Sequence, residues 1–425
     1  MRRRWSRRVS ISKMYFSDFS YRVAALAMLL TLVTACGGGG TTPAPTISTS
    51  PPTLNNVIKV SVDGGPANSG RNVNRLYTNV TICSPGSSTQ CQTIDHVLVD
   101  TGSTGLRLLS SAMAPALNLN PQTATSGLPL LNCAQFIDNS FAWGPVATAD
   151  IVLGGKTAAS VPIQIIADPA FDRPAAACAV GGTAIDTLAV LGANGIIGLG
   201  LSKEDCGAAC VATAHNGSYY TCTDASCTAT KGVTASIAMQ LKNPVSLFAS
   251  DNNGVLIDLP AVSPDGASSL NGSLIFGINT QANNQLTSGR VLTTDAAGNF
   301  STLLAGQNLN TSFIDSGSNG LFFDSTTIPP CSGGNSAGFY CPGAPVNLSA
   351  TLVGANAVST AVSFSVDNAL TLFADASKAV LPSLSGPMGD TSSFDWGLPF
   401  FYGRRVFIGM EGQASSLGTG AFYAF

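Results

Sequence analysis

His96–Ser111 has the sequence HVLVDTGSTGLRLLSS, in which a run of strand-forming residues ends at Asp100 and enters a glycine-containing turn. Thr311–Ser325, TSFIDSGSNGLFFDS, repeats this arrangement around Asp315. One such turn is most often an ordinary surface turn, because Asp, Gly and Ser all favour turn conformations. Two copies in matching apolar surroundings instead predict an internal duplication, with one aspartate contributed by each half of the chain.

The duplication extends past the two aspartates. In the segment GIIGLG, Gly198 follows Asp100 by 98 residues, and in WGLPFF, Gly397 follows Asp315 by 82 residues. Short Val, Ile, Thr and Phe runs between Gly and Pro turns predict a mostly β chain. Its 425 residues exceed the usual size of one domain. The best candidates for short helices are TASIAMQLKN and the stretch near SSAMAPAL.

The N-terminal residues predict export and attachment to a membrane. Residues 1–35 combine a basic stretch with the apolar run Val23–Val33, which is too short to cross a bilayer core of about 30 Å as a helix. The run ends in VTAC, which resembles the lipobox of bacterial lipoproteins, and Cys36 would then carry the lipid after signal-peptide cleavage. A plain secretion signal followed by a structural cysteine is the alternative. The glycine after Cys36 favours the outer membrane, by resemblance to enterobacterial sorting.

The chain after the signal peptide is acidic and begins with a tether. Residues 36–56 are rich in Gly, Thr and Pro, which predicts a flexible linker. Seven of the 20 basic residues and one of the 23 acidic residues precede residue 36, which leaves 13 basic and 22 acidic residues and a net charge of −9. This charge gives no support for a nucleic-acid partner.

Ten cysteines remain after Cys36, an even number that predicts five disulfides in an exported chain. Spacing does not determine connectivity, and the four cysteines between 206 and 227 could pair in other ways. A zinc site in that cluster is the alternative, but two histidines and an oxidising compartment argue against a metal. Pairing of near neighbours would give Cys83–Cys91, Cys133–Cys178, Cys206–Cys210, Cys222–Cys227 and Cys331–Cys341.

Other enzyme classes lack their characteristic residues in this chain. A Ser-His-Asp hydrolase would need His96 or His215, and the sequence has no G-x-S-x-G motif. The segment VLGGKTAAS lacks the full spacing of a phosphate-binding loop. We therefore expect no nucleotide and no other cofactor.

The paired Asp motifs, each followed in the same order by an apolar-Gly segment, resemble those of the pepsin-like aspartic peptidases. The resemblance covers roughly Val57–Phe425, and the chain is also similar to a group of exported bacterial lipoproteins of similar length. It implies an all-β, bilobal pepsin-like fold with two homologous β-barrel-like lobes, residues 57–245 and 246–425, and a cleft between them. A polypeptide in that cleft would be the substrate or ligand.

The resemblance further implies that Asp100 and Asp315 form a catalytic dyad. Two carboxylates within about 3 Å of each other cannot both stay ionised and share one proton, as in the aspartic proteases. One would take a proton from a water held between them while the other donates to the scissile carbonyl. The residues implied to support the dyad are Gly102 and Gly317 at its backbone, Ser103 and Ser318 at its outer oxygens, Thr101 and Ser316 between the lobes, and Ile197, Gly198, Trp396 and Gly397 packed beneath the turns.

One departure from the family pattern leaves two hypotheses for function. Family members usually carry a Trp seven residues after the first Asp, hydrogen-bonded to a Tyr of the flap, whereas this chain has Arg107. Phe136, Phe141 and Trp143 are the candidates to cover the cleft. The intact dyad favours an exported, lipid-anchored aspartic endopeptidase, which is a hydrolase. The altered flap favours a catalytically idle cell-surface binding protein with the same fold.

Overall fold

The structure is a computed structural model that describes residues 55–115, 117, 119–180, 182–214 and 218–425. The predicted signal peptide, the lipidation site Cys36 and nearly all of the tether lie outside these residues. Within the described part of the chain, no helix is long and apolar enough to cross a membrane. Its helices are short, so the prediction of a mostly β chain is confirmed: α1 (Leu188–Leu191), α2 (Ala208–Ala212), α3 (Ala369–Ala374) and the 3-10 turns η1 (Ser110–Ala112), η2 (Pro169–Phe171), η3 (Pro244–Leu247), η4 (Ala282–Asn284), η5 (Gly334–Ser336) and η6 (Leu398–Phe401).

Six strands from the first half of the chain close into a barrel. They pair in the order β7-β8-β4-β9-β3-β2, and β2 pairs back onto β7 to complete the ring. Along β3, Val97 and Val99 join the main apolar core, whereas Leu98 between them packs in a second cluster, as the two-residue period of a strand requires. The barrel strands are β2 (Leu76–Cys83), β3 (Cys91–Asp100), β4 (Thr104–Leu109), β7 (Phe141–Leu153), β8 (Lys156–Ile166) and β9 (Gly195–Leu199).

The same sheet continues from the barrel into the second half of the chain. From β2 it runs through β1, β13, β12, β22, β25 and β14. Beyond β7 it continues through β6, β10 and β11, and the short strand β5 also pairs with β7 off this path. The continuing strands are β1 (Val57–Val62), β12 (Gly254–Leu259), β13 (Leu270–Phe276), β14 (Val291–Thr293), β22 (Arg404–Gly409) and β25 (Phe422–Ala424). The shorter strands are β5 (Asn120–Pro121), β6 (Leu130–Gln135), β10 (Tyr219–Cys222) and β11 (Thr230–Gly232).

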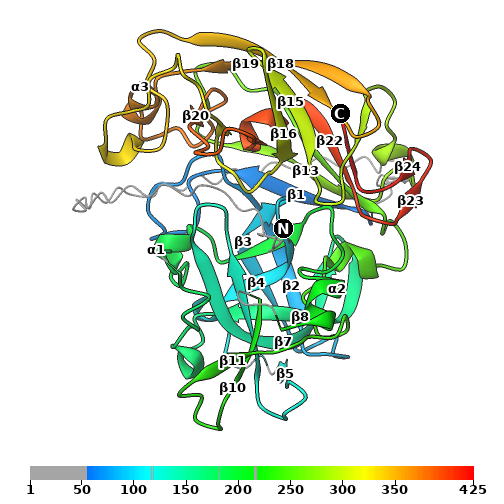
Figure 1. Cartoon of the computed structure of the whole chain (residues 1–425). Coiled ribbons are helices and arrows are strands. Elements are labelled where there is room, and N and C mark those ends of the chain that lie inside the picture. The colour runs from blue at the N-terminus through cyan, green and yellow to red at the C-terminus, as the bar shows by residue number, and fades with distance from the viewer. Residues whose placement is uncertain (1–54, 116, 118, 181, 215–217) are drawn as a thin grey trace, which may run out of the picture.

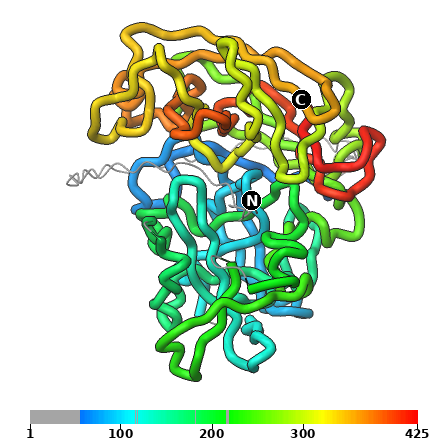
Figure 2. Tube along the Cα trace, viewed as in Figure 1, coloured from blue at the N-terminus to red at the C-terminus, as the bar shows by residue number. Residues whose placement is uncertain are grey.

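A second sheet of seven strands is built from the later part of the chain, in the order β19-β18-β15-β16-β21-β17-β20. In Figure 1 this sheet lies at the opposite end of the molecule from the barrel, and the trace in Figure 2 passes from blue and green at one end to yellow and orange at the other. Its strands are β15 (Phe300–Leu304), β16 (Gln307–Ile314), β17 (Leu321–Phe323), β18 (Val346–Val353), β19 (Ser359–Val366), β20 (Ser385–Gly386) and β21 (Phe394–Trp396), and a separate ribbon contains β23 (Ala414–Ser415) and β24 (Gly418–Thr419).

The duplication in the sequence is also present in the strand pairing. In the barrel, β3 pairs with β9 in parallel, β9 with β4 antiparallel, and β4 with β8 in parallel. In the seven-stranded sheet, β16 pairs with β21 in parallel, β21 with β17 antiparallel, and β17 with β20 in parallel. Each Asp turn therefore joins two strands that flank the strand of an apolar-Gly segment.

The five disulfides of the structure are the five near-neighbour pairs that the sequence predicts. Cys133–Cys178 closes the longest loop, 45 residues apart, and ties β6 to the chain after β8. The cluster between 206 and 227 forms two local disulfides.

The predicted short helix at TASIAMQLKN is wrong, and only a single 3-10 turn, η1, forms near SSAMAPAL. The first segment is held by tertiary contacts instead. The buried side chain of Gln240 donates to the carbonyl oxygens of Gly207 and Ala235 at 2.9 Å each. The Leu241 N–H donates to the Tyr219 hydroxyl at 2.8 Å rather than to a helix carbonyl.

Candidate active site

Each aspartate of the duplicated motif lies where a strand runs into a tight turn. Asp100 ends β3, Asp315 follows β16, and both side chains are fully buried. The Gly102 N–H donates to Asp100 Oδ1 at 2.8 Å, and the Gly317 N–H donates to Asp315 Oδ1 at 2.7 Å. A Cβ at residue 317 would lie 2.6 Å from Asp100 Oδ1, so this close approach requires glycine.

The two carboxyl groups meet at one point. The Gly102 N–H that bonds Asp100 also donates to Asp315 Oδ1 at 3.1 Å. The two carboxyl groups are close enough that the charge of Asp315 raises the pKa of Asp100. Because an ionised carboxylate can only accept hydrogen bonds, a hydrogen bond between the two groups would need a proton on one of them.

Burial and mutual charge favour that shared proton. Burial raises the pKa of Asp100 well above its ordinary value, and the neighbouring charge of Asp315 raises it further. Burial also raises the pKa of Asp315, although hydrogen bonds from Asp100, Gly317 and Ser318 oppose the shift. The two groups titrate as one system, so the proton belongs to the pair.

A serine hydroxyl lies against the outer oxygen of each carboxyl group. Ser103 Oγ donates to Asp100 Oδ2, and Ser318 Oγ lies 3.0 Å from Asp315 Oδ2. Both serines are buried. The structure thus places both predicted hydroxyls where they hold the carboxyl planes in position.

Reciprocal hydrogen bonds connect the two turns. The Ser316 N–H donates to Thr101 Oγ1 at 2.9 Å, and the Thr101 N–H donates to Ser316 Oγ at 3.2 Å. Each hydroxyl donates onward to a carbonyl of the opposite half: Ser316 Oγ to Val99 at 2.8 Å and Thr101 Oγ1 to Ile314 at 3.4 Å. All four atoms are buried, so this exchange fixes the distance between the aspartates.

The glycines of the apolar-Gly segments allow close packing beneath the turns. Gly198 pairs with Asp100 across β9 and β3, and a Cβ on it would lie 2.4 Å from the Thr104 nitrogen. A Cβ on Gly397 would lie 2.1 Å from the Gly320 carbonyl oxygen. Their apolar neighbours in these segments are fully buried: Ile197 and Trp396.

The three flap candidates all pack into apolar clusters of the first half. Phe136 lies in a cluster that includes residues of β3 and β9. Phe141 and Trp143 share a cluster with the Cys133–Cys178 disulfide, and Trp143 packs edge-to-face on Tyr220. The proposed role of these residues in covering a cleft stays a prediction.

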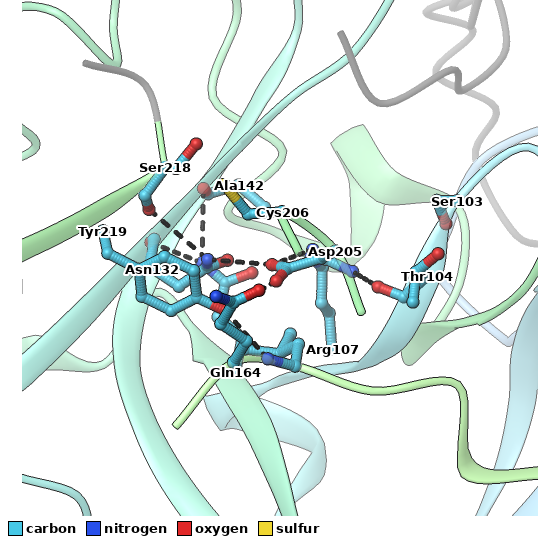
Figure 3. Close-up of polar contacts among 12 residues, drawn as sticks. Ser103, Thr104, Arg107, Asn132, Ala142, Gln164, Asp205, Cys206, Ser218 and Tyr219 are labelled. Atoms are coloured by element: carbon cyan, nitrogen blue, oxygen red, sulfur yellow. Dashed lines mark hydrogen bonds and ion pairs between the residues drawn. The ribbon is translucent and has the colours of Figure 1, made fainter. Parts of the chain in front are cut away.

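Arg107, at the position where Trp was expected, anchors a buried polar network (Figure 3). Its guanidinium donates to the Thr104 carbonyl at 2.7 Å and forms an ion pair of 3.4 Å with Asp205. Asp205 also accepts hydrogen bonds from the Tyr219 hydroxyl at 2.7 Å and from the Asn132 amide at 3.2 Å. These bonds connect the Asp100 turn to β6, which carries Asn132, and to β10, which carries Tyr219.

Burial controls the charges of this network. It raises the pKa of Asp205 to about 6, even though Arg107 and the Tyr219 hydroxyl act to lower it. Burial also lowers the pKa of Arg107, against the opposing charges of Asp205, Tyr219 and Asp100. Because Thr104 follows Ser103, the Arg107–Thr104 bond stabilises the turn that carries the Asp100 hydroxyl partner.

The sequence analysis missed two residues near this site. Asp205 lies 98 residues after Arg107, and no local pattern links the two. Asp395 lies in β21, two residues before Gly397, and its Oδ2 is 2.5 Å from Ser318 Oγ. One signal could have revealed Asp395: its counterpart two residues before Gly198 is apolar Ile196.

The fold and these bonds together define a mostly β protein with two buried aspartates held side by side by duplicated turns. The chain belongs to the family described as "Protein of unknown function (DUF3443)", whose model matches residues 52–425. Among solved structures, the aspartic proteinase from Irpex lacteus is similar, with a TM-score of 0.46 and 12% sequence identity over 87% of this chain and 96% of that chain. No curated protein matches the chain.

Proposed function

We propose that this protein is an aspartic endopeptidase with a bilobal, pepsin-like architecture. The observation that carries the proposal is that one backbone group, the Gly102 N–H, donates to Oδ1 of both Asp100 and Asp315. The barrel would form one lobe, the seven-stranded sheet would form the core of the other, and a peptide would bind between them.

The chemistry follows from the shared proton. The ionised carboxyl group removes a proton from a water molecule, and the protonated one donates to the scissile carbonyl oxygen. Water attacks the carbonyl carbon, so no covalent intermediate with the enzyme forms. The bonds from Gly102, Gly317, Ser103 and Ser318 keep both carboxyl groups oriented throughout.

We further propose that the protein is exported and lipid-anchored at Cys36, with its body held away from the membrane by residues 37–56. Five disulfides support an oxidising compartment outside the cytoplasm. Metabolic labelling with a radioactive fatty acid tests the anchor, because Cys36→Ser should abolish the label.

One observation favours the second candidate function, a binding protein with an idle dyad. Both aspartate side chains are fully buried, so a peptide reaches them only if the structure opens. In this case the protein would bind extended polypeptides without cleaving them.

Cleavage of a denatured, unbiased peptide mixture by residues 41–425 tests the proposal. We would follow the products by mass spectrometry from acid to neutral pH, with and without pepstatin, beside Asp100→Asn and Asp315→Asn. We expect cleavage that pepstatin inhibits and that each substitution abolishes. A folded, disulfide-bonded protein that retains peptides without cleaving them at any pH would favour the binding function instead.

A further inference from the structure

A third buried carboxyl group lies next to the aspartate pair. Asp395 in β21 is 1% exposed, and its Oδ2 is 2.5 Å from Ser318 Oγ. The same hydroxyl oxygen is 3.0 Å from Asp315 Oδ2. Ser318 therefore lies between two carboxyl oxygens, and both distances fall in the range of O–H···O hydrogen bonds.

The two contacts of the Ser318 hydroxyl limit how many protons Ser318, Asp315 and Asp395 can hold together. A serine hydroxyl carries one proton and donates to one acceptor at a time, and an ionised carboxylate can only accept. Two hydrogen bonds at Ser318 Oγ therefore require a second proton, held by either Asp315 or Asp395. With the proton shared by Asp100 and Asp315, the three carboxyl groups form one chain of coupled sites.

The third carboxyl group breaks the symmetry of the duplication. Asp395 pairs with Phe313 in β16, and the equivalent position in the barrel is Ile196, which pairs with Leu98 in β3. The extra carboxyl group is thus confined to the Asp315 side.

Within the described part of the chain, the ionisable groups that interact with this site include the three carboxyl groups, the Tyr423 phenol and the Arg107 guanidinium, whose charge interacts with Asp100. Tyr423, from β25, has its pKa raised first by burial and then by the charges of Asp315 and Asp395. Three carboxyl groups this close together and this well buried cannot all be ionised. The chain therefore retains protons at pH values where exposed aspartates are ionised.

We infer that Asp395 is a positioning residue that holds a second proton for the aspartate pair and exchanges it with Asp315 through Ser318. When Asp315 passes its proton to Ser318 Oγ, the hydroxyl passes its own proton to Asp395 Oδ2. One O–H bond breaks and one forms at each step, Ser318 stays neutral, and the negative charge moves from Asp395 to Asp315. The role of this exchange in peptide hydrolysis rests on the proposed function.

The experiment compares the protein with Asp395→Asn, which keeps a neutral hydrogen-bond donor, and with Asp395→Ile, the residue of the duplicated half. Asp390→Asn is the control, because Asp390 also accepts hydrogen bonds from serines, Ser392 and Ser393, but lies on the surface. The first readout is the NMR titration of aspartates labelled with 13C at the carboxyl carbon. The second is the pH dependence of kcat/KM for a peptide that the protein cleaves.

Removal of the Asp395 carboxyl group should move the titration of the Asp100–Asp315 pair to lower pH by about one unit or more, because a neighbouring negative charge is lost. The limbs of the pH–rate profile should move in the same direction, and Asp390→Asn should leave both unchanged. A titration of the pair that is the same in both Asp395 variants as in the unmodified protein would overturn the inference. Should the unmodified protein cleave no peptide, the proposed function fails, and the NMR titration alone still decides whether Asp395 is coupled to the pair.

Discussion

At the scale of single residues, the two aspartates have the same turn but different surroundings. Asp100 has one hydroxyl at its outer oxygen, from Ser103, whereas Asp315 shares its hydroxyl, from Ser318, with a further carboxyl group. Asp100 therefore has a serine hydroxyl to itself, whereas the hydroxyl next to Asp315 has a second carboxyl group as its neighbour. This asymmetry gives a physical reason for the two carboxyl groups to take different roles.

The raised pKa values of the pair predict how its charge affects stability. Both carboxyl groups have a pKa above the ordinary value in the folded protein, so the folded state binds more protons than the unfolded state above about pH 4. The two protonated carboxyl groups add to the free energy of unfolding. This contribution is fully present below about pH 4 and is lost as the pH rises through the pKa values of the folded state. Asp100→Asn removes the contribution of Asp100 to this dependence, so the melting temperature of the variant relative to the unmodified protein should increase between pH 3 and pH 7. A difference that stays constant over this range would contradict the raised pKa values.

The Arg107–Asp205 pair predicts a large effect of removing one partner. Arg107→Met leaves Asp205 buried without its cation, which should cost about 3–5 kcal/mol at pH 7. The cost should be smaller at pH 4, below the folded pKa of Asp205 of about 6, because Asp205 is then protonated in the folded state. Denaturant unfolding measures both values.

The exposed pair Lys378–Asp375 supplies the matched control for Arg107→Met. Its atoms are 3.7 Å apart and partly solvated, so Lys378→Met should change stability by about 1 kcal/mol or less. The double variant Arg107→Met with Asp205→Leu should recover part of the loss. Equal costs for the buried and exposed pairs would show that Arg107 is not paired as the structure has it.

Local sequence predicted the inside of each dyad turn well, because the bonds within a turn join residues at most three positions apart. The Gly102–Asp100 and Ser103–Asp100 bonds follow from the spacing inside one tight turn. The Arg107–Asp205 bond joins β4 to the loop after β9, and the pairing of β4 with β9, strands far apart in the sequence, brings the two residues together. The sequence therefore showed that Arg107 departs from the family pattern, but it did not indicate that Asp205 is its partner.

At the scale of elements, the unit that positions each aspartate is a strand pair with a third strand inserted between them. Here β9 lies between β3 and β4, and β21 lies between β16 and β17. The order of motifs predicted the duplication, but short strands such as β20 give no pattern long enough to recognise. The local pattern also failed to predict the structure of the segment TASIAMQLKN. Its apolar residues have a helix-like spacing, but the buried hydrogen bonds of Gln240 hold the segment in a non-helical conformation.

The glycines of the two apolar-Gly segments, Gly198 in β9 and Gly397 directly after β21, predict a defined cost for an added methyl group. Gly198→Ala and Gly397→Ala each place a Cβ within 2.4 Å of backbone atoms, which should destabilise the protein by about 1–3 kcal/mol and lower any peptidase activity. Gly343→Ala is the control, because a Cβ there meets nothing within 4 Å, and its effect should stay within about 0.5 kcal/mol. Urea unfolding measures all three, and equal effects would show that the two turns are not packed as described.

At the scale of the whole molecule, the barrel is joined to the second half of the chain both by a continuous sheet, which runs from β2 to β14, and by polar contacts. Lys156 at the start of β8 forms a buried ion pair of 2.6 Å with Asp251, which precedes β12. Asp251 also accepts bonds from Thr280 and Gln281 in the second half of the chain. These contacts link the two halves at a point separate from the aspartate pair.

The disulfides predict a graded dependence of stability on loop length. By chain entropy, removal of Cys133–Cys178, which spans 45 residues, should cost about 4 kcal/mol, and removal of Cys206–Cys210, which spans 4, should cost about 2 kcal/mol. Serine replacement of both cysteines in each pair, followed by denaturant unfolding, measures the difference. A larger loss from the short loop would show that native contacts, rather than chain entropy, set the contribution of each disulfide.

The proposed function requires Asp100 and Asp315 to act together in the hydrolysis of a peptide bond. The most direct measurement is the kcat/KM for one cleaved peptide with the unmodified protein, Asp315→Asn and the control Asp324→Asn, which changes a partly buried aspartate nine residues further on. Loss of the acid–base pair should lower the value about 10³-fold or more in Asp315→Asn, while Asp324→Asn should match the unmodified protein. Equal cleavage by Asp315→Asn and the unmodified protein would contradict the account.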